Sequence, residues 1–212
     1  LKMDFNNSDN IENLKLFIND LNIQTTPEDL ISLVSSLYHS VEANIYNKRH
    51  CNTLMKESFI LKKLFKYLPK YDHVAILDFG CGTGYISIEL IKYLQHVNPD
   101  INIEIHGVDQ SKEMLDIFET NLQKYGVKLH VSCTDNFTYN TTYDIILTNS
   151  VLHHLFNVEE FLENISSSLK NGGYYISGHE PNSYYFENKF LNNFHFSYNI
   201  YTNSKKGLIY KF

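Results

Sequence analysis

The spacing of hydrophobic positions changes near residue 70 of the chain. Before that point, apolar side chains recur every three or four residues, which is the period of an amphipathic helix. Thr26 followed by Pro27 is a typical helix start, with a hydroxyl N-cap and a proline at the first helical position. We therefore expect helices over most of residues 10–68, with one helix starting near Pro27 and another covering residues 54–68.

Beyond residue 70, short apolar runs alternate with helical segments. Strands are expected at residues 74–77, 101–108, 127–131, 143–148 and 174–178, with helices between them and a turn at 170–173. Strands that alternate with helices predict βαβ units and a parallel sheet with right-handed crossovers. The expected fold class is an α/β, doubly wound, mostly parallel sheet. Residues 1–70 would form a helical lid and residues 71–212 the main domain.

The last thirty residues fit this fold less easily. Residues 194–200 alternate apolar and polar side chains, as a half-buried strand does, and residues 208–212 could pair back after a turn at 203–207. This leaves room only for short C-terminal strands, unless the chain is truncated and part of the binding site is missing.

Composition narrows the function classes. The 212 residues are 43% hydrophobic, enough for a core, and carry a formal charge of −6. Arg49 is the only arginine, which disfavours nucleic-acid binding because base and phosphate recognition favours arginine. No apolar run approaches the ~18 residues of a membrane span, and no signal peptide is recognisable. Three widely spaced cysteines predict a cytoplasmic protein without a structural metal.

A glycine-rich turn follows the first expected strand. Gly80, Gly82 and Gly84 alternate, so the backbone can turn sharply and a ligand can approach it closely. A dinucleotide fingerprint would need a third glycine where Tyr85 or Ser87 stands, so a nicotinamide or flavin cofactor is disfavoured. The turn could also be a connector without any ligand.

A carboxylate follows the second expected strand. In parallel sheets, ligands bind outside the carboxyl ends of the strands. Asp109 stands there, 25 residues after Gly84, and is placed to accept hydrogen bonds from both hydroxyls of a ribose. The alternative roles are a solvated loop aspartate or the N-cap of the next helix. Together with the glycine turn, we favour the ribose.

These residues resemble a known family. Residues 76–84 (ILDFGCGTG) and 107–115 (GVDQSKEML) are similar to two motifs of the class I S-adenosylmethionine-dependent methyltransferases, and the resemblance covers residues 74–180. It implies a Rossmann-like fold and S-adenosyl-L-methionine as cofactor. The residues that it implies for cofactor binding are Asp78, Gly80, Cys81, Gly82, Gly84, Asp109, Gln110, Met114, Asp135, Asn136, Asn149 and Tyr46.

Within this set, the resemblance assigns parts of the cofactor to particular positions. The glycines would line its methionine portion, Asp78 would anchor its amino group, and Asp109 would hold the ribose. Gln110 and Met114 would border the adenine, and Asp135 would accept from the adenine amino group. An Asx turn is the competing role for Asp135. Tyr46 would close over the methionine end, within a lid that Tyr38, His39 and His50 could also line; aromatic packing against the sheet is the alternative for each.

The segment after the fourth expected strand concerns the methyl acceptor. It reads Asn149-Ser150-Val151-Leu152, not the Asn/Asp-Pro-Pro-aromatic sequence found in methyltransferases of adenine or glutamine nitrogen. It resembles the corresponding segment of small-molecule enzymes. His153 and His154 follow, and a histidine can act as a general base near neutral pH. Either could instead only hydrogen-bond a loop; we favour His154 slightly. His179 and Glu180 after the fifth strand could touch the acceptor or merely fix a turn.

The expected function is methyl transfer to an O, N or C nucleophile of a small molecule by in-line displacement, in a monomer or homodimer without a membrane span. A non-catalytic scaffold or regulatory binding protein is the main alternative, because a fold does not fix a function. A nucleotide-linked oxidoreductase is a third possibility, which Tyr85 disfavours.

Overall fold

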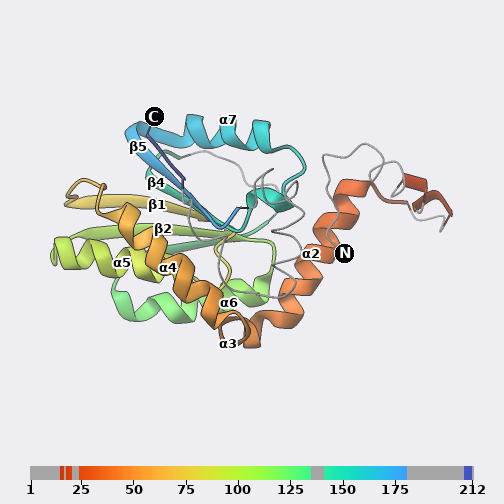
Figure 1. The fold of residues 1–212 in the computed structure, drawn as a ribbon, viewed down its shortest axis with the longest axis horizontal. Coiled ribbons are helices and arrows are strands. Elements are labelled where there is room, and N and C mark those ends of the chain that lie inside the picture. The colour runs from red at the N-terminus through yellow and green to blue at the C-terminus, as the bar shows by residue number, and fades with distance from the viewer. Residues whose placement is uncertain (1–14, 17, 21–23, 135–140, 181–207, 212) are drawn as a thin grey trace, which may run out of the picture.

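The computed structural model describes residues 15–16, 18–20, 24–134, 141–180 and 208–211. Its centre is one six-stranded sheet with the order β3-β2-β1-β4-β5-β6 (Figure 1). The first five strands are parallel, and β6 is antiparallel to β5. The strands are β1 (His73–Phe79), β2 (Asn102–Asp109), β3 (Lys128–Cys133), β4 (Tyr143–Asn149), β5 (Leu169–Gly178) and β6 (Leu208–Lys211). The predicted α/β parallel sheet is confirmed.

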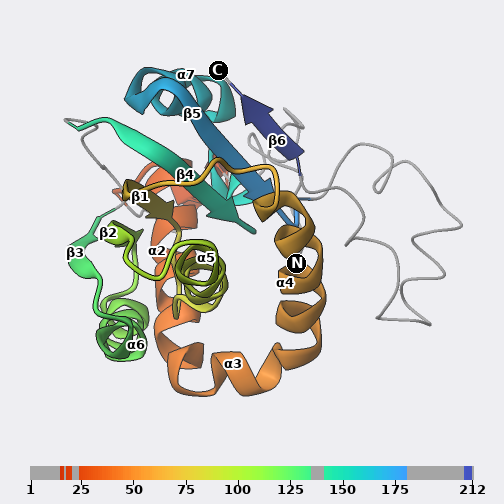
Figure 2. The same cartoon turned by 90° about the vertical axis from the view of Figure 1, so that its left-hand side faces the viewer.

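Helices cover both faces of the sheet. The α-helices are α2 (Pro27–Glu42), α3 (Tyr46–Arg49), α4 (Cys51–Phe65), α5 (Tyr85–Val97), α6 (Lys112–Leu122) and α7 (Val158–Ser168), and the short 3-10 turns are η1 (Ala43–Ile45), η2 (Gln123–Tyr125) and η3 (Leu152–His154). In Figure 1, α7 lies on one side of the sheet, and α4, α5 and α6 lie on the other. Figure 2 shows α4 running beside α5, against which it packs.

The strand period of two explains how the sheet supplies both cores. Ile76 of β1 is fully buried in the cluster beneath α4, α5 and α6, while its neighbour Leu77 is fully buried in the cluster that contains Phe161 and Ile165 of α7. Each fully buried side chain of this size stabilises the fold by about 1.5–3 kcal/mol. The two cores fix the sheet between its helical layers, so the carboxyl ends of β1, β2 and β4 meet at one edge.

Two local predictions need correction. The turn expected at residues 170–173 lies within β5, where Tyr143 pairs with Leu169 and Ile145 pairs with Tyr174. The extra β5 residues form a bulge, because Gly172 adopts a left-handed φ of +79° that lets the strand bend without ending. The second helix, expected at residues 54–68, is α4 at residues 51–65.

The N-terminal and C-terminal predictions are met only in part. Thr26 caps α2, accepting a hydrogen bond from the Asp29 backbone N–H at 3.1 Å, as predicted. The predicted terminal strand is present as β6, paired with β5. The strand expected at residues 194–200 lies outside the described residues.

Candidate functional site

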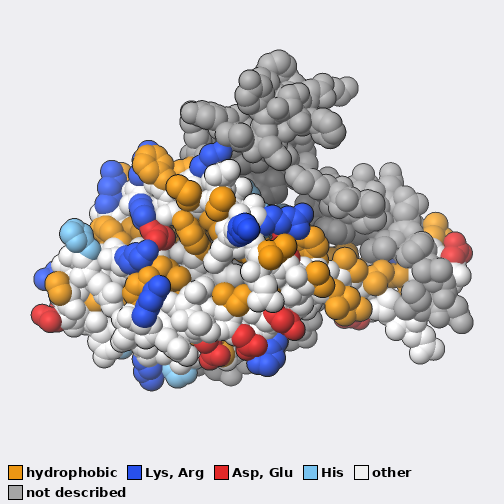
Figure 3. All heavy atoms as spheres, turned by 90° about the horizontal axis from the view of Figure 1, so that it is seen from below, with side chains coloured by type: hydrophobic (Ala, Val, Ile, Leu, Met, Phe, Trp, Pro, Cys, Tyr) orange, Lys and Arg blue, Asp and Glu red, His pale blue; other side chains and the backbone are white. Residues whose placement is uncertain are grey.

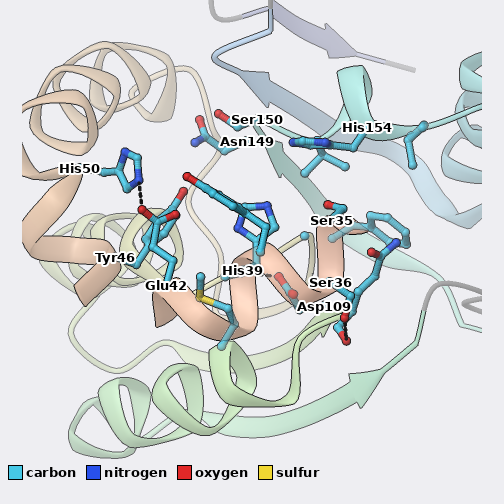
Figure 4. Close-up of a pocket in the computed structure, with 18 of the residues that line it drawn as sticks. Ser35, Ser36, His39, Glu42, Tyr46, His50, Asp109, Asn149, Ser150 and His154 are labelled. Carbon is cyan, nitrogen blue, oxygen red and sulfur yellow. Dashed lines mark hydrogen bonds and ion pairs between the residues drawn. The ribbon is translucent and has the colours of Figure 1, made fainter. Parts of the chain in front are cut away.

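A cavity of about 220 Å³ opens at the carboxyl ends of β1, β2 and β4. Its walls come from three parts of the chain: the α2–α3 region, the ends of β1 and β2, and the segment after β4. Figure 4 shows His39 of α2 pointing into the space between these walls, with Asn149, Ser150 and His154 on the opposite side. The residues that line it include His39, Glu42, Tyr46, His50, Gly80, Gly82, Asp109, Gln110, Met114, Asn149, Ser150, Val151 and His154.

The glycine turn combines packing with access to the cavity. All three glycines have positive φ, at +69° for Gly80, +50° for Gly82 and +80° for Gly84. A Cβ atom at Gly80 would lie 2.4 Å from a methyl group of Val151, and one at Gly84 would lie 2.7 Å from the Phe118 ring. At Gly82, which lines the cavity, it would meet nothing within 4 Å. Gly80 and Gly84 therefore allow Val151 and Phe118 to pack closely against the turn, whereas Gly82 leaves space at the cavity wall.

Asp109 ties the second strand to this turn. Its Oδ2 accepts a hydrogen bond from the Gly82 backbone N–H at 2.8 Å, and its Oδ1 accepts one from the Ser111 backbone N–H at 2.9 Å. Burial raises the pKa of Asp109, and the backbone N–H donors and His39 oppose that rise. A carboxylate can accept about four hydrogen bonds, so each oxygen can still accept one from a ligand.

Asp78 lies behind the turn rather than on the cavity wall. Its side chain is buried, and its Oδ2 accepts a hydrogen bond from the Ser87 hydroxyl at 2.5 Å. Burial raises the pKa of Asp78 to about 7, with a smaller contribution from the nearby charge of Asp109. Asp78 is therefore a carboxyl group whose proton is released near neutral pH.

Two other predicted cofactor residues also do not line the cavity. Cys81 is 7% exposed and its sulfur packs beside Gly107, while Gly84 is the N-cap of α5 against Phe118. Both support the turn from behind, because Cys81 packs towards β2 and Gly84 packs against α6. Burial raises the pKa of the Cys81 thiol.

The α2–α3 wall carries the predicted lid residues. Glu42 is 3% exposed, and its Oε1 accepts from Arg49 at 2.8 Å and lies 3.0 Å from Nε2 of His50. Its Oε2 is buried without a hydrogen-bond partner among the described residues. The Tyr46 ring packs on His50 with centroids 4.6 Å apart, and burial raises the pKa of Tyr46 to about 12. Sequence reasoning named Tyr46, His39 and His50 but missed Glu42.

The two adjacent histidines have separate environments. The His154 ring lines the cavity and makes an edge contact with His39 at 5.9 Å between centroids. Burial, followed by the neighbouring histidines, lowers the pKa of His154 to about 4, so its imidazole is neutral at pH 7. His153 does not line the cavity, because its Nδ1 lies 2.8 Å from a carboxylate oxygen of Glu180.

Glu180 fixes the turn that carries these histidines. One of its oxygens accepts hydrogen bonds from the backbone N–H groups of Val151 at 2.7 Å and Leu152 at 2.9 Å, and the other lies against His153. Glu180 thus acts on the cavity through the η3 turn and does not touch its interior.

A second set of contacts joins the ends of β4 and β5. Ser150 and His179 have left-handed φ angles of 61° and 53°, and the Ser150 hydroxyl lies 2.5 Å from Nδ1 of His179. Glu57 of α4, which is buried, accepts from the Asn149 amide at 2.8 Å and lies 3.2 Å from the same His179 nitrogen. Sequence reasoning missed Glu57, because nothing in its local pattern distinguishes it from the other polar residues of α4.

Three further findings bear on the predictions. Asp135 and Asn136 lie outside the described residues. Among the residues that are described, no group of three or more His, Cys, Asp or Glu side chains could hold a metal ion. In the same part of the chain, no helix is both long and apolar enough to cross a membrane.

Residues 70–205 match the model of a family described as "Methyltransferase domain", and the chain belongs to this family. It is 28% identical over 138 residues to malonyl-[acyl-carrier protein] O-methyltransferase of Bacillus cereus, covering 62% of this chain and 48% of that protein. It is 22% identical over 144 residues to ubiquinone biosynthesis O-methyltransferase of Rickettsia canadensis, covering 64% and 58%. The chain thus spans about half the length of these curated relatives.

A solved structure supports the same class. An S-adenosylmethionine-dependent methyltransferase from Clostridium acetobutylicum superposes with a TM-score of 0.53 and 26% identity, covering 70% of this chain and 59% of that one. The fold is therefore the Rossmann-like fold of class I methyltransferases, and the cofactor of this class is S-adenosylmethionine. The described residues fit such a ligand, since Gly82 leaves open space and Glu42 presents an unpartnered buried oxygen.

Proposed function

We propose that this protein transfers the methyl group of S-adenosylmethionine to an oxygen, nitrogen or carbon nucleophile of a small molecule. The observation that carries the proposal is that one cavity is lined by Gly82 of the glycine turn and Asp109 at the end of β2, and by His154 on the opposite wall. The bound cofactor supplies an electrophilic sulfonium methyl group. The protein then needs chiefly to align the nucleophile and to exclude water.

The cofactor side of the proposal uses the β1 and β2 ends. Asp109 accepts the ribose hydroxyls with the capacity that remains on its two oxygens, and Gly82 allows the methionine portion to approach the backbone. Gln110 and Met114, both at the wall, border the adenine. Asn149 and Tyr46 border the methionine end. Roles for Asp135 and Asn136 remain predictions from the sequence.

Asp78 has an indirect role in this proposal. When ionised, its carboxylate stabilises the amino group of the bound cofactor from behind the turn. Cys81 and Gly84 shape the turn. Because the pKa of Asp78 is about 7, cofactor binding would draw a proton from this group at neutral pH.

On the acceptor side, His154 is the candidate general base. Its neutral imidazole can take a proton from a hydroxyl or amine of the acceptor during attack. A pKa of about 4 makes it a weak base, so we assign it an orienting hydrogen bond first and proton removal second. His153, held by Glu180, has a positioning role rather than a catalytic one. The O-methyltransferase names of the two relatives favour an oxygen nucleophile.

The test is methyl transfer from labelled S-adenosylmethionine to a panel of phenols, carboxylic acids and amines. We expect labelled product from at least one class, and we expect His154→Gln to lower kcat with little change in the affinity for S-adenosylhomocysteine. Tight binding of S-adenosylhomocysteine without methylation of any acceptor class would favour a binding protein. Absence of binding would exclude both a methyltransferase and a cofactor-binding protein.

A further inference from the structure

Cationic side chains are concentrated in one short stretch of the chain. Residues 48–70 contain seven of the 18 Lys and Arg residues, but only one of the 24 Asp and Glu residues, Glu57. Glu57 is buried, so it presents no charge to the surface. The stretch has a formal charge of +6 in a chain whose total is −6. This asymmetry is not needed by the proposed methyl transfer.

Two of these cations form ion pairs with buried carboxylates. Arg49 pairs with Glu42 at 2.8 Å, and Lys62 pairs with Glu89. The same stretch also carries Lys48 on α3, Lys56 and Lys63 on α4, and Lys66 and Lys70 just after α4. These five lysines contribute the positive charge of the outer surface of the α3–α4 region.

Large apolar side chains lie between these lysines. Met55, Phe59 and Tyr67 are 63%, 61% and 64% exposed. Met55, Phe59 and Lys63 are spaced four residues apart along α4, and Lys66, Tyr67 and Lys70 follow directly after its end; we call these six residues the basic stripe. The ammonium of Lys63 lies 4.4 Å from the centre of the Phe59 ring, and that of Lys66 lies 5.2 Å from the centre of the Tyr67 ring.

Apolar exposure continues on the helix that precedes this region. On α2, Leu33, Val34, Leu37 and Val41 are 56%, 58%, 57% and 85% exposed, although other residues of α2 line the cavity. In Figure 3, the face seen from below shows Lys and Arg side chains interspersed with hydrophobic ones. Exposed apolar and aromatic side chains interspersed with lysines are typical of surfaces that lie at a lipid–water interface.

We propose that the basic stripe attaches the protein to an anionic lipid surface. Lysine is a strongly hydrated point charge that suits attraction to lipid headgroups. Protein interfaces are depleted in lysine and enriched in arginine, and the single arginine here is already paired with Glu42, so a lipid surface fits this chemistry better than an acidic protein. If the proposed function also holds, attachment would bring the enzyme to acceptors dissolved in the lipid.

The experiment is flotation of the full chain with vesicles of phosphatidylcholine alone or mixed with phosphatidylglycerol. The test variant is Lys63→Gln/Lys66→Gln/Lys70→Gln. Its matched control is Lys112→Gln/Lys124→Gln/Lys128→Gln, which removes the same charge from the α6–β3 region. Each lysine neutralised near an anionic surface weakens binding about fivefold, so we expect a loss of about a hundredfold in the test variant and little in the control.

The expected result also includes no binding to neutral vesicles and weaker binding at high salt. Absence of vesicle binding, or equal losses in both triple variants, would overturn the proposal. Retention on immobilised polyglutamate without vesicle binding would overturn it in favour of an acidic protein partner. Calorimetry with S-adenosylhomocysteine on the same samples keeps this outcome separate from the proposed function, because that titration tests the cavity alone.

Discussion

The two halves of the cavity are built in different ways. At the ends of β1 and β2, left-handed backbone is supplied by Gly80, Gly82 and Gly84, where it costs little. At the ends of β4 and β5 it is supplied by Ser150 and His179, where side chains make it unfavourable by about 1–2 kcal/mol each. The first half is encoded in two short segments of sequence, residues 76–84 and 107–115, whereas the second depends on contacts from elsewhere in the fold.

Those contacts explain why the second half holds its shape. The Ser150–His179 pair, Glu57 of α4 and Glu180 tie the β4 and β5 ends together through hydrogen bonds between residues 28 to 92 positions apart. Unfavourable backbone of this kind persists only where the surroundings fix it, and it is concentrated at functional sites. The comparison therefore predicts that changes in the first half alter cofactor affinity, and that changes in the second alter turnover.

The largest expected effect concerns Asp78 and pH. Because its folded-state pKa of about 7 lies above the ordinary value of 3.8, the folded protein retains a proton that the unfolded chain has lost between about pH 4 and pH 7. Its contribution to stability is therefore greatest below pH 4 and is lost as the pH rises to 7, by about 4 kcal/mol in total. Asp78→Asn should flatten this pH dependence in denaturant unfolding. The exposed Asp100→Asn is the control, and equal pH profiles for both would contradict the assignment.

The next largest effect is expected at Asp109. Replacing its carboxylate in Asp109→Asn removes two charge-assisted acceptors for a ribose, which should weaken S-adenosylhomocysteine binding about a hundredfold. Isothermal titration calorimetry measures this directly. Asp116→Asn, on the exposed surface of α6, should bind like the unaltered protein. Full affinity in Asp109→Asn would show that this residue only organises the turn.

Gly82 offers a matched comparison with Gly126, because both have positive φ and open space at the Cβ position. An alanine at either site should destabilise the fold by about 1–2 kcal/mol through backbone strain. Only Gly82→Ala places a methyl group at the cavity wall, so it alone should weaken S-adenosylhomocysteine binding, by about 30-fold. Similar affinities in the two variants, measured by calorimetry beside their unfolding free energies, would remove Gly82 from the site.

The smallest effect is expected in the half of the cavity at the ends of β4 and β5. Glu180→Gln loses a charge-assisted interaction with the η3 turn, so turnover with whichever acceptor class of the panel is methylated should fall about tenfold. Cofactor affinity should stay within about twofold, because the residue touches neither Gly82 nor Asp109. Glu163→Gln, on the exposed side of α7, is the control. A parallel loss of affinity and turnover would indicate a general structural role for Glu180.

The difference between the two halves of the cavity also explains which features could be predicted from the sequence. The parallel sheet, the α2 cap at Thr26 and the positions of Gly82 and Asp109 at the cavity follow from local spacing and turn chemistry. The position of His154 at the cavity, with His153 turned away, does not, because it depends on Glu180 some 27 positions further along the chain. The bulge at Gly172 was misjudged as a turn for a related reason: only pairing with β4 keeps that segment in the sheet.

The most direct test of the central claim is a crystal structure of the protein with S-adenosylhomocysteine. We predict that its ribose hydroxyls lie within hydrogen-bond distance of Asp109, that its amino-acid portion passes Gly82, and that its sulfur faces the wall formed by Ser150 and His154. Ligand density bound elsewhere, or a ribose that makes no contact with Asp109, would contradict the account.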